Sequence, residues 1–336
     1  MAARAVIFGV AGPELTPGER DFLAEAAPWG FILFGRNIES PGQLLRLTGA
    51  LRDCVGRDAP VLIDQEGGRV ARMRAPHWRE WATAAEECAR LPDLSLRVRA
   101  MHLRSRLIAA ELTAVGIDVN CAPVLDVVGE GTHGIILGRA YASDPAEVAA
   151  IGRGVADGLL DGGVLPVVKH VPGHGRAGVD SHLALPVVEA PRAALEAVDF
   201  APFRALADLP MAMSAHVVYR ALDPDRPATL SPEVIGLIRR DIGFDGLLMT
   251  DDLSMRALSG PFERRAQDAL AAGCDVVLHC NGDAGEMAAI AAAVPDLTGR
   301  AAARAVAALA RRGAGAGDID AAAAEFAALA GAGAGA

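Results

Sequence analysis

The sequence contains almost no lysine. Its 32 lysines and arginines include one lysine, Lys169, and only 4% of the 336 residues are aromatic. Arginine is a broad planar fork, whereas lysine is a compact, strongly hydrated point charge on a thin stem. The retained lysine therefore indicates a position where a narrow donor fits and a guanidinium does not. Three of the eight histidines, His170, His174 and His182, follow it closely, so this segment is the first candidate for a functional site.

Paired cysteines and long apolar runs are also missing. The five cysteines are scattered and form no CxxC pair, which is typical of reduced thiols in a cytoplasmic protein. No stretch has the roughly eighteen uncharged apolar residues of a membrane span, and the N-terminal run 5–10 resembles a first strand more than a signal peptide. A net charge of −10 disfavours nucleic-acid or anionic-membrane partners, which require a basic face. We therefore expect a cytoplasmic protein with neither kind of partner.

Short apolar runs alternate with alanine- and leucine-rich helical stretches along the chain. The runs predict eight strands, at 5–10, 31–34, 61–63, 117–121, 165–168, 211–213, 246–250 and 275–279. The principal helical stretches are 40–54, 95–115, 145–161, 191–207 and 231–241. Continuous apolar strands separated by helices imply buried parallel strands, and eight such units fit an α/β fold of the (β/α)8 TIM-barrel type. An open doubly wound sheet is the alternative, but no Gly-x-Gly-x-x-Gly follows the first strand.

No linker divides the chain into two domains, so we expect residues 1–312 to form one barrel. Residues 313–336 are a Gly/Ala-rich tail in which 321–329 can form a last helix. Its end, 331–336, has almost nothing to bury and is expected to be disordered. A one-domain barrel with an acidic surface is expected to be a monomer.

Polar residues follow several of the predicted strands. In chain order they are Asp64, Lys169, His170, Ser214, His216, Asp251, His279 and Asn281. The carboxyl ends of barrel strands form the usual mouth of an active site. We therefore expect these side chains to meet at one end of the barrel.

Asp251 and Asp252 follow the apolar run 247–250. Neighbouring residues on a strand point to opposite sides, so only one of the two carboxylates can easily face the mouth. We expect Asp251 to face it as a candidate nucleophile and Asp252 to cap a helix that begins near Leu253. A pair of aspartates at a strand end also suits a metal site.

Asp180 and His182 form a second candidate group. Asp180 can accept the ring N–H of His182, which orients the imidazole and favours its charged form, so the pair can donate a proton and later take one back. Three glycines within 172–179 would let this loop open and close over a ligand. Zinc is the alternative, but Lys169 opposes a dication and the spacing matches no common zinc motif, so no metal is expected.

Asp64 begins a third motif, which contains a glycine pair and ends at Arg72. A carboxylate can accept hydrogen bonds from vicinal hydroxyls and a guanidinium can donate to others, so the motif suits a sugar pocket. For both Glu66 and Arg69 a buried salt bridge under the loop is favoured. Arg139, after the fourth strand, can add a donor to the same mouth.

Together these motifs resemble glycoside hydrolase family 3. They are 64–69, 169–175 with 180–182, 214–216 and 250–255, within a likeness that runs in order from about 8 to 281. More narrowly, the chain resembles the single-domain bacterial cytoplasmic β-N-acetylglucosaminidases of peptidoglycan recycling. Two departures are visible: Val171 replaces the family's usual phenylalanine, and Gly138 stands where an acidic residue is common before Arg139.

The resemblance implies a role for each candidate residue. Asp251 is the expected nucleophile, and His182 is the expected acid/base, supported by Asp180. The residues expected to bind the N-acetylglucosamine unit are Asp64, Arg72, Arg139, Lys169 and His170. The resemblance implies neither a metal nor another cofactor.

The function that follows from the resemblance is retaining exo-β-N-acetylglucosaminidase activity. The expected partner is a small carbohydrate, a muropeptide-type glycan fragment cleaved through a covalent glycosyl-enzyme intermediate. One alternative is a phosphorylase with the same nucleophile, since a histidine acid/base would not repel an incoming phosphate. The others are a non-catalytic sugar-binding barrel and a metal-dependent hydrolase.

Overall fold

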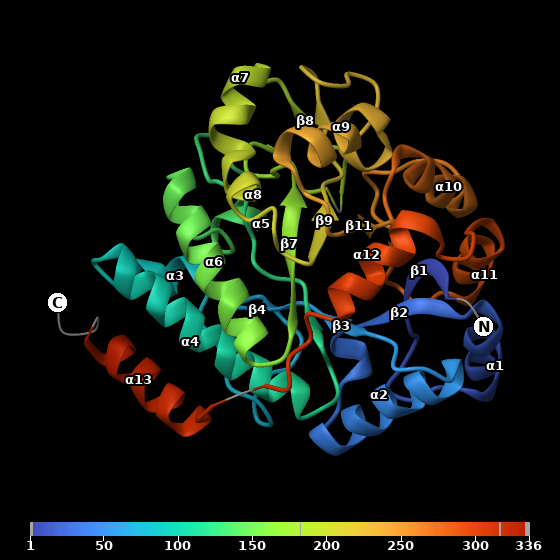
Figure 1. Cartoon of the computed structure of the whole chain (residues 1–336), viewed down its shortest axis with the longest axis horizontal. Coiled ribbons are helices and arrows are strands. Elements are labelled where there is room, and N and C mark those ends of the chain that lie inside the picture. Colours follow the sequence, from blue (N-terminus) through green and yellow to red (C-terminus); the bar gives the residue numbers. More distant parts are fainter. Residues whose placement is uncertain (1–2, 182, 316, 333–336) are drawn as a thin grey trace.

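Eight parallel strands close into a barrel in the computed structural model, which describes residues 3–181, 183–315 and 317–332. Around the barrel the strand order is β1-β12-β11-β9-β7-β6-β3-β2 (Figure 1). These strands are β1 (Arg4–Gly9), β2 (Pro28–Leu33), β3 (Val61–Ile63), β6 (Val119–Asn120), β7 (Leu165–Val171), β9 (Met211–Ser214), β11 (Leu247–Asp252) and β12 (Val276–His279). All eight coincide with predicted strands, and the predicted barrel is confirmed.

Helices surround the barrel, and most of them follow a strand in sequence. They are α1 (Pro17–Ala26), α2 (Pro41–Val55), α3 (Ala84–Ala89), α4 (Leu94–Thr113), α5 (Gly134–Leu137), α6 (Pro145–Asp161), α7 (Arg192–Ala194), α8 (Ala201–Ala205), α9 (Pro232–Leu237), α10 (Phe262–Ala272), α11 (Ala284–Ala293), α12 (Gly299–Leu309) and α13 (Ile319–Ala332). Single turns of tighter or wider helix are η1 (Gly35–Asn37), η2 (Leu195–Asp199), η3 (Ala228–Leu230) and η4 (Ile238–Ile242). Two short pairs lie outside the barrel, β4 (Gln65–Gly67) with β5 (Val70–Ala71) and β8 (Val187–Val188) with β10 (Val218–Tyr219).

The strands are apolar on both faces because each face has its own core. On β1, Ile7 belongs to the cluster inside the barrel, whereas Val6 and Phe8 belong to the cluster between the sheet and the helices. All three side chains are fully buried. This alternation follows from the two-residue period of a strand.

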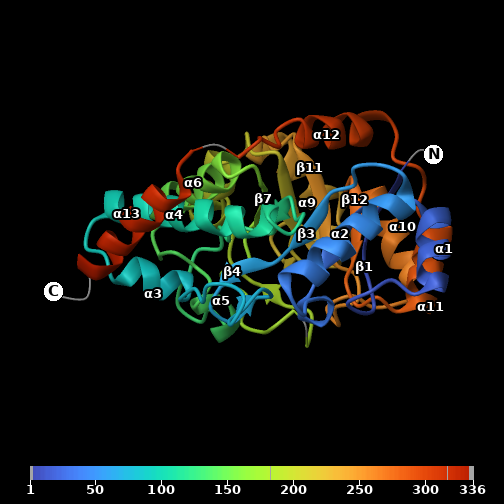
Figure 2. The same cartoon turned by 90° about the horizontal axis from the view of Figure 1, so that it is seen from below.

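The two ends of the barrel differ. The helix α12 lies across the end where the strands start, and its Ala305 and Ala308 pack against the barrel interior. The helix α5 and the pair β4–β5 lie at the opposite end (Figure 2). The carboxyl end of the barrel is therefore the end at which irregular segments can enclose a ligand.

The last helix, α13, packs along α4. Phe326 meets the ring of Trp81 edge-on with centroids 5.6 Å apart, and Glu325 forms an ion pair with Arg99 at 2.6 Å. The helix expected at 321–329 is thus longer than predicted and extends to Ala332. Residues 333–336, the rest of the segment expected to be disordered, lie outside the described residues. No helix in the described ranges is long and apolar enough to cross a bilayer.

Candidate active site

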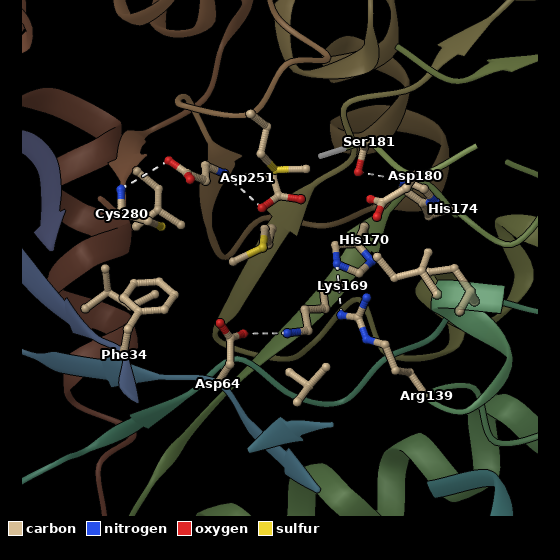
Figure 3. A pocket seen from close by; sticks show the side chains of 18 of the residues that line it. Phe34, Asp64, Arg139, Lys169, His170, His174, Asp180, Ser181, Asp251 and Cys280 are labelled. Atoms are coloured by element: carbon tan, nitrogen blue, oxygen red, sulfur yellow. Dashed lines mark hydrogen bonds and ion pairs between the residues drawn. The ribbon is translucent and has the colours of Figure 1, made fainter. Parts of the chain in front are cut away.

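A cavity of about 390 Å³ opens at the carboxyl ends of the strands. Seven of the eight predicted site residues line it: Asp64, Arg72, Arg139, Lys169, His170, Asp180 and Asp251. All of these except Arg72 are labelled in Figure 3. The eighth, His182, lies outside the described residues. Segments far apart in the sequence therefore meet in one cavity, as the positions at strand ends predict.

Lys169 lies on the floor of the cavity between two carboxylates. Its Nζ is 2.7 Å from Asp64 Oδ1 and 2.6 Å from Glu66 Oε1, and 2% of its side chain is exposed. Burial alone would lower the pKa of Lys169, but Asp64 and Glu66 raise it above its ordinary value. The lysine therefore stays charged, and the two close carboxylates and its near-complete burial leave room for a compact ammonium only.

Glu66 holds two cations in place. Its oxygens accept hydrogen bonds from Arg139 Nε and Nη2 at 2.9 and 2.8 Å, in addition to the contact with Lys169. Burial would raise the pKa of Glu66, but Arg139 and Lys169 lower it to about 2. Glu66 thus supplies the negative charge beside Arg139, although Gly138 occupies the position that is often acidic in the family.

The salt bridge predicted for Glu66 is present, but the one predicted for Arg69 is wrong. Arg69 is exposed, and its guanidinium donates to the carbonyl of Ile135 at 3.0 Å. Its short β4–β5 turn carries the side chain outward to the rim of the cavity, so burial under the loop does not occur.

The pair β4–β5 places Arg72 against Asp64. Gln65 Oε1 accepts the backbone N–H of Arg72 at 2.8 Å, which fixes the turn from within. The Arg72 guanidinium then donates to Asp64 Oδ2 at 3.0 Å and lies 5.1 Å from the centre of the Phe34 ring. Burial would raise the pKa of Asp64, but Lys169 and Arg72 lower it well below its usual range.

A buried arginine supports this turn from below. Arg104 is 1% exposed and donates from Nη2 to the carbonyls of Glu66 and Ala82, each at 2.7 Å. The intervening Gly67 has φ +107°, and a Cβ there would collide with the Arg104 guanidinium. The first glycine of the sequence motif is therefore required for this approach.

Asp126 is a buried residue of the site that the sequence analysis missed. Its Oδ2 lies 2.7 Å from His170 Nδ1, and its Oδ1 accepts the backbone N–H groups of His170 and His174 at 3.2 and 2.7 Å. Burial would raise the pKa of Asp126, but His170 lowers it well below its usual range. The charged carboxylate thus orients the His170 ring, whose Nε2 lies 3.5 Å from Arg139 Nη2.

Asp251 and Asp252 have different surroundings, but both line the cavity, whereas only Asp251 was expected to face it. Asp251 points into the cavity from the wall opposite Asp64 (Figure 3). Asp252 Oδ1 instead accepts the backbone N–H groups of Ser254 and Cys280 at 3.0 and 3.1 Å. The expected helix after Asp252 is wrong, because turns follow and α10 begins at Phe262.

Four other strand-end residues do not line the cavity, contrary to expectation. Ser214, His216 and His279 are fully buried, and Asn281 donates to Glu286 at 2.6 Å. His216 links Thr229 Oγ1 at 2.8 Å to the carbonyl of Asp252 at 3.0 Å. These residues support the backbone behind the cavity, and His216 does so directly beneath the pair of aspartates.

The described residues offer no cluster of three His, Cys, Asp or Glu side chains arranged to hold a metal. What the cavity does provide is a set of paired cations and carboxylates on one wall and Asp251 on the other. Such pairs can donate hydrogen bonds to vicinal hydroxyls through the cation and accept hydrogen bonds from them through the carboxylate.

Comparisons with known proteins agree with this geometry. The model of the glycosyl hydrolase family 3 N-terminal domain matches residues 16–312. The β-hexosaminidase of Alkalilimnicola ehrlichii is 42% identical over 281 residues, covering 82% of this chain and 80% of that protein. The β-hexosaminidase of Methylococcus capsulatus is also 42% identical, covering 82% of both chains.

Solved structures share the fold over nearly the whole chain. NagZ from Neisseria gonorrhoeae in complex with N-trifluoroacetyl-D-glucosamine is 30% identical with a TM-score of 0.84, covering 98% of this chain and 99% of that one. A family 3 β-N-acetylglucosaminidase from Paenibacillus sp. str. FPU-7 is 33% identical with a TM-score of 0.82. That match covers 94% of this chain but only 62% of the other, so this chain spans less than two thirds of that protein. The chain belongs to glycosyl hydrolase family 3 and is a glycoside hydrolase of the β-N-acetylhexosaminidase class.

Proposed function

We propose that this enzyme is a retaining exo-β-N-acetylglucosaminidase that acts through a covalent glycosyl-enzyme intermediate. The observation that carries the proposal is the position of Asp251, across one cavity from the paired cations and carboxylates around Lys169. That arrangement would hold the hydroxyls of a sugar on one wall and leave its anomeric carbon toward the other. N-acetylglucosamine as this sugar is supported by the name of the Paenibacillus relative, a β-N-acetylglucosaminidase, and by the N-trifluoroacetyl-D-glucosamine bound to the Neisseria relative.

In the first step Asp251 attacks the anomeric carbon while His182 protonates the departing oxygen. The bond from C1 to the leaving group breaks, and an ester bond from C1 to a carboxylate oxygen forms. The role proposed for Asp180 is to accept the ring N–H of His182, which would favour the charged imidazolium that protonates the departing oxygen. In the second step neutral His182 takes a proton from water, which attacks C1 and releases Asp251.

The ion pairs on the wall opposite Asp251 would bind the sugar with side chains that are already ordered. Asp64, which lines the cavity, is held charged by Lys169 and Arg72, so its remaining lone pairs can accept from sugar hydroxyls. Arg139 and His170 are fixed by Glu66 and Asp126, which lowers the ordering cost of binding.

We also propose that the leaving group is an acidic, muropeptide-type fragment. Among the described arginines and the lysine that line the cavity, Arg69 is the one that donates to a backbone carbonyl and not to a carboxylate. It stands at the rim, beside Ile135. A guanidinium with unused N–H donors is suited to a carboxylate on the aglycone.

The test compares aryl glycosides with good and poor leaving groups. Asp251→Ala should abolish turnover of both, because no nucleophile remains. His182→Ala should reduce turnover of the phenyl glycoside about 100-fold or more but that of the dinitrophenyl glycoside only slightly, since general acid catalysis matters when the leaving group is basic. Equal loss on both substrates would count against His182. Product analysis with and without phosphate then separates hydrolysis from phosphorolysis.

A further inference from the structure

Ser181 is buried within an exposed stretch of chain. Among the described residues between 178 and 185 it alone is buried, with 6% exposed, while Leu183 is 69% exposed. Serine is a small polar residue that is usually exposed. Its burial here indicates a specific anchoring contact.

Two contacts anchor Ser181, and they come from two segments that are far apart in the sequence. Its Oγ lies 3.3 Å from His174 Nε2, which belongs to the base of the same loop (Figure 3). Its carbonyl accepts the backbone N–H of Ala257 at 3.2 Å. Ala257 follows β11, the strand that carries Asp251, so Ser181 connects the loop to the segment of the proposed nucleophile.

His174 is itself rigidly held. It is 3% exposed, its backbone N–H donates to Asp126, and its ring lies edge-on to His170 at 5.5 Å between centroids. The next residues are fixed as well, since Thr132 Oγ1 donates to the Gly175 carbonyl at 2.7 Å. The loop is therefore firmly placed as far as Ala177, which is fully buried and accepts the backbone N–H of His133 at 3.2 Å, and the next buried residue among those described is Ser181.

The segment beyond Ser181 turns back on itself. The backbone N–H groups of Leu183 and Ala184 both donate to the carbonyl of Asp180, at 2.9 and 3.0 Å. Ser181 thus lies inside the turn that carries Asp180 and the position of the proposed acid/base. The contacts that hold Ser181 therefore also set the distance between this turn and the segment that follows β11.

We infer that His174 and Ser181 are positioning residues, whose side-chain contact holds the 180–184 turn in register with the proposed nucleophile. The inference rests on the proposed function, because it assigns the effect to proton donation from this turn. Asp126 contacts both histidines: it orients the ring of the sugar-facing His170 and accepts the backbone N–H of His174. Sugar binding and loop placement therefore share one buried carboxylate.

Ser181→Ala should slow the reaction selectively. On the phenyl N-acetylglucosaminide we expect kcat to fall about 10-fold or more, and on the dinitrophenyl glycoside about threefold or less, because only the former needs a well-placed acid. The inhibition constant of N-acetylglucosamine should stay unchanged. Ser181→Thr, which retains the hydroxyl, should restore most of the phenyl glycosidase activity, and Leu183→Ala is the control within the same turn.

A double-variant cycle tests the contact itself. His174→Ala alone should resemble Ser181→Ala, and the double variant should lose little more than either single variant, because both changes remove the same interaction. Losses that multiply, or a Ser181→Ala defect equal on both substrates, would overturn the inference. His182→Ala is measured alongside: if it shows no leaving-group dependence the proposed acid/base fails, and if it alone shows that dependence the positioning role fails. Melting curves for every variant establish that it is folded.

Discussion

The ammonium of Lys169 donates to Asp64 Oδ1 over 2.7 Å on the floor of the cavity, and 2% of the lysine side chain is exposed. The same Nζ reaches Glu66 Oε1 at 2.6 Å. Two charged acceptors and almost no free space surround one narrow donor. This contact links the sequence's only lysine to the wall that we propose binds the sugar.

The substitution Lys169→Arg should therefore weaken substrate binding strongly although it preserves the charge. A guanidinium is wider than an ammonium and must push Asp64 and Glu66 apart, so we expect KM to rise about 10- to 100-fold, which corresponds to about 1.4–2.7 kcal/mol. Steady-state kinetics on the nitrophenyl N-acetylglucosaminide measure it. The matched control is Arg97→Lys, which changes an ion pair with Glu147 away from the cavity. An unchanged KM for Lys169→Arg would contradict the proposed fit.

Arg69→Gln should affect acidic substrates alone. Because Arg69 is exposed, its ion pair with an aglycone carboxylate should be worth about two- to fivefold in kcat/KM, and the preference should weaken as salt rises. Neutral aryl glycosides should be cleaved at the original rate. The control is Arg74→Gln, since Arg74 is also exposed and also donates only to backbone carbonyls, but does not line the cavity. Equal effects of Arg69→Gln on acidic and neutral substrates would argue against the acidic aglycone.

The buried ring of His174 should make stability fall in mild acid. Burial, followed by the nearby His170, lowers the pKa of His174 to about 4, although Asp126 and Asp251 act in the opposite direction. In the unfolded chain His174 takes up a proton near pH 6.5, whereas in the folded protein it does so only near pH 4. The burial of the neutral ring therefore contributes fully to the free energy of unfolding above pH 6.5. This contribution is lost as the pH falls from 6.5 toward 4, by about 3 kcal/mol in all.

His174→Gln removes this titration. Thermal melts at pH 7.5 and pH 5 should therefore show a smaller loss of Tm for His174→Gln than for the original enzyme. His216, whose pKa is also lowered by burial, remains in both proteins and contributes the same background. A variant whose Tm falls just as far between the two pH values would refute the assignment.

The barrel could be predicted from the sequence because its signal is local. Each apolar run of the chain became a barrel strand, and helix α6 begins where expected, with Asp144 accepting the N–H groups of Ala146 and Glu147 at 2.8 and 3.0 Å. The clustering of Asp64, Lys169 and Asp251 also followed from their positions at strand ends. These inferences need only the two-residue period of strands and the common direction of parallel strands.

The direction in which each side chain at a strand end points, and how deeply it is buried, could not be predicted in the same way. Ser214 and His216 also follow a strand, but they turn toward Thr229 behind the cavity, and no local pattern encodes that choice. Asp126 lies in an irregular segment after β6, where periodicity gives no information. The later start of the helix after Asp252 could have been predicted locally, because Gly260 and Pro261 mark a break in the chain immediately before α10. Gly260 has φ +87° there.

The most direct test of the account is to trap the intermediate. A slow fluorinated N-acetylglucosaminide should add the mass of one sugar unit to the intact enzyme, and peptide mapping should place it on Asp251. Asp251→Asn should take up no label. Steady turnover without an adduct, or an adduct on any residue other than Asp251, would contradict the covalent mechanism proposed here.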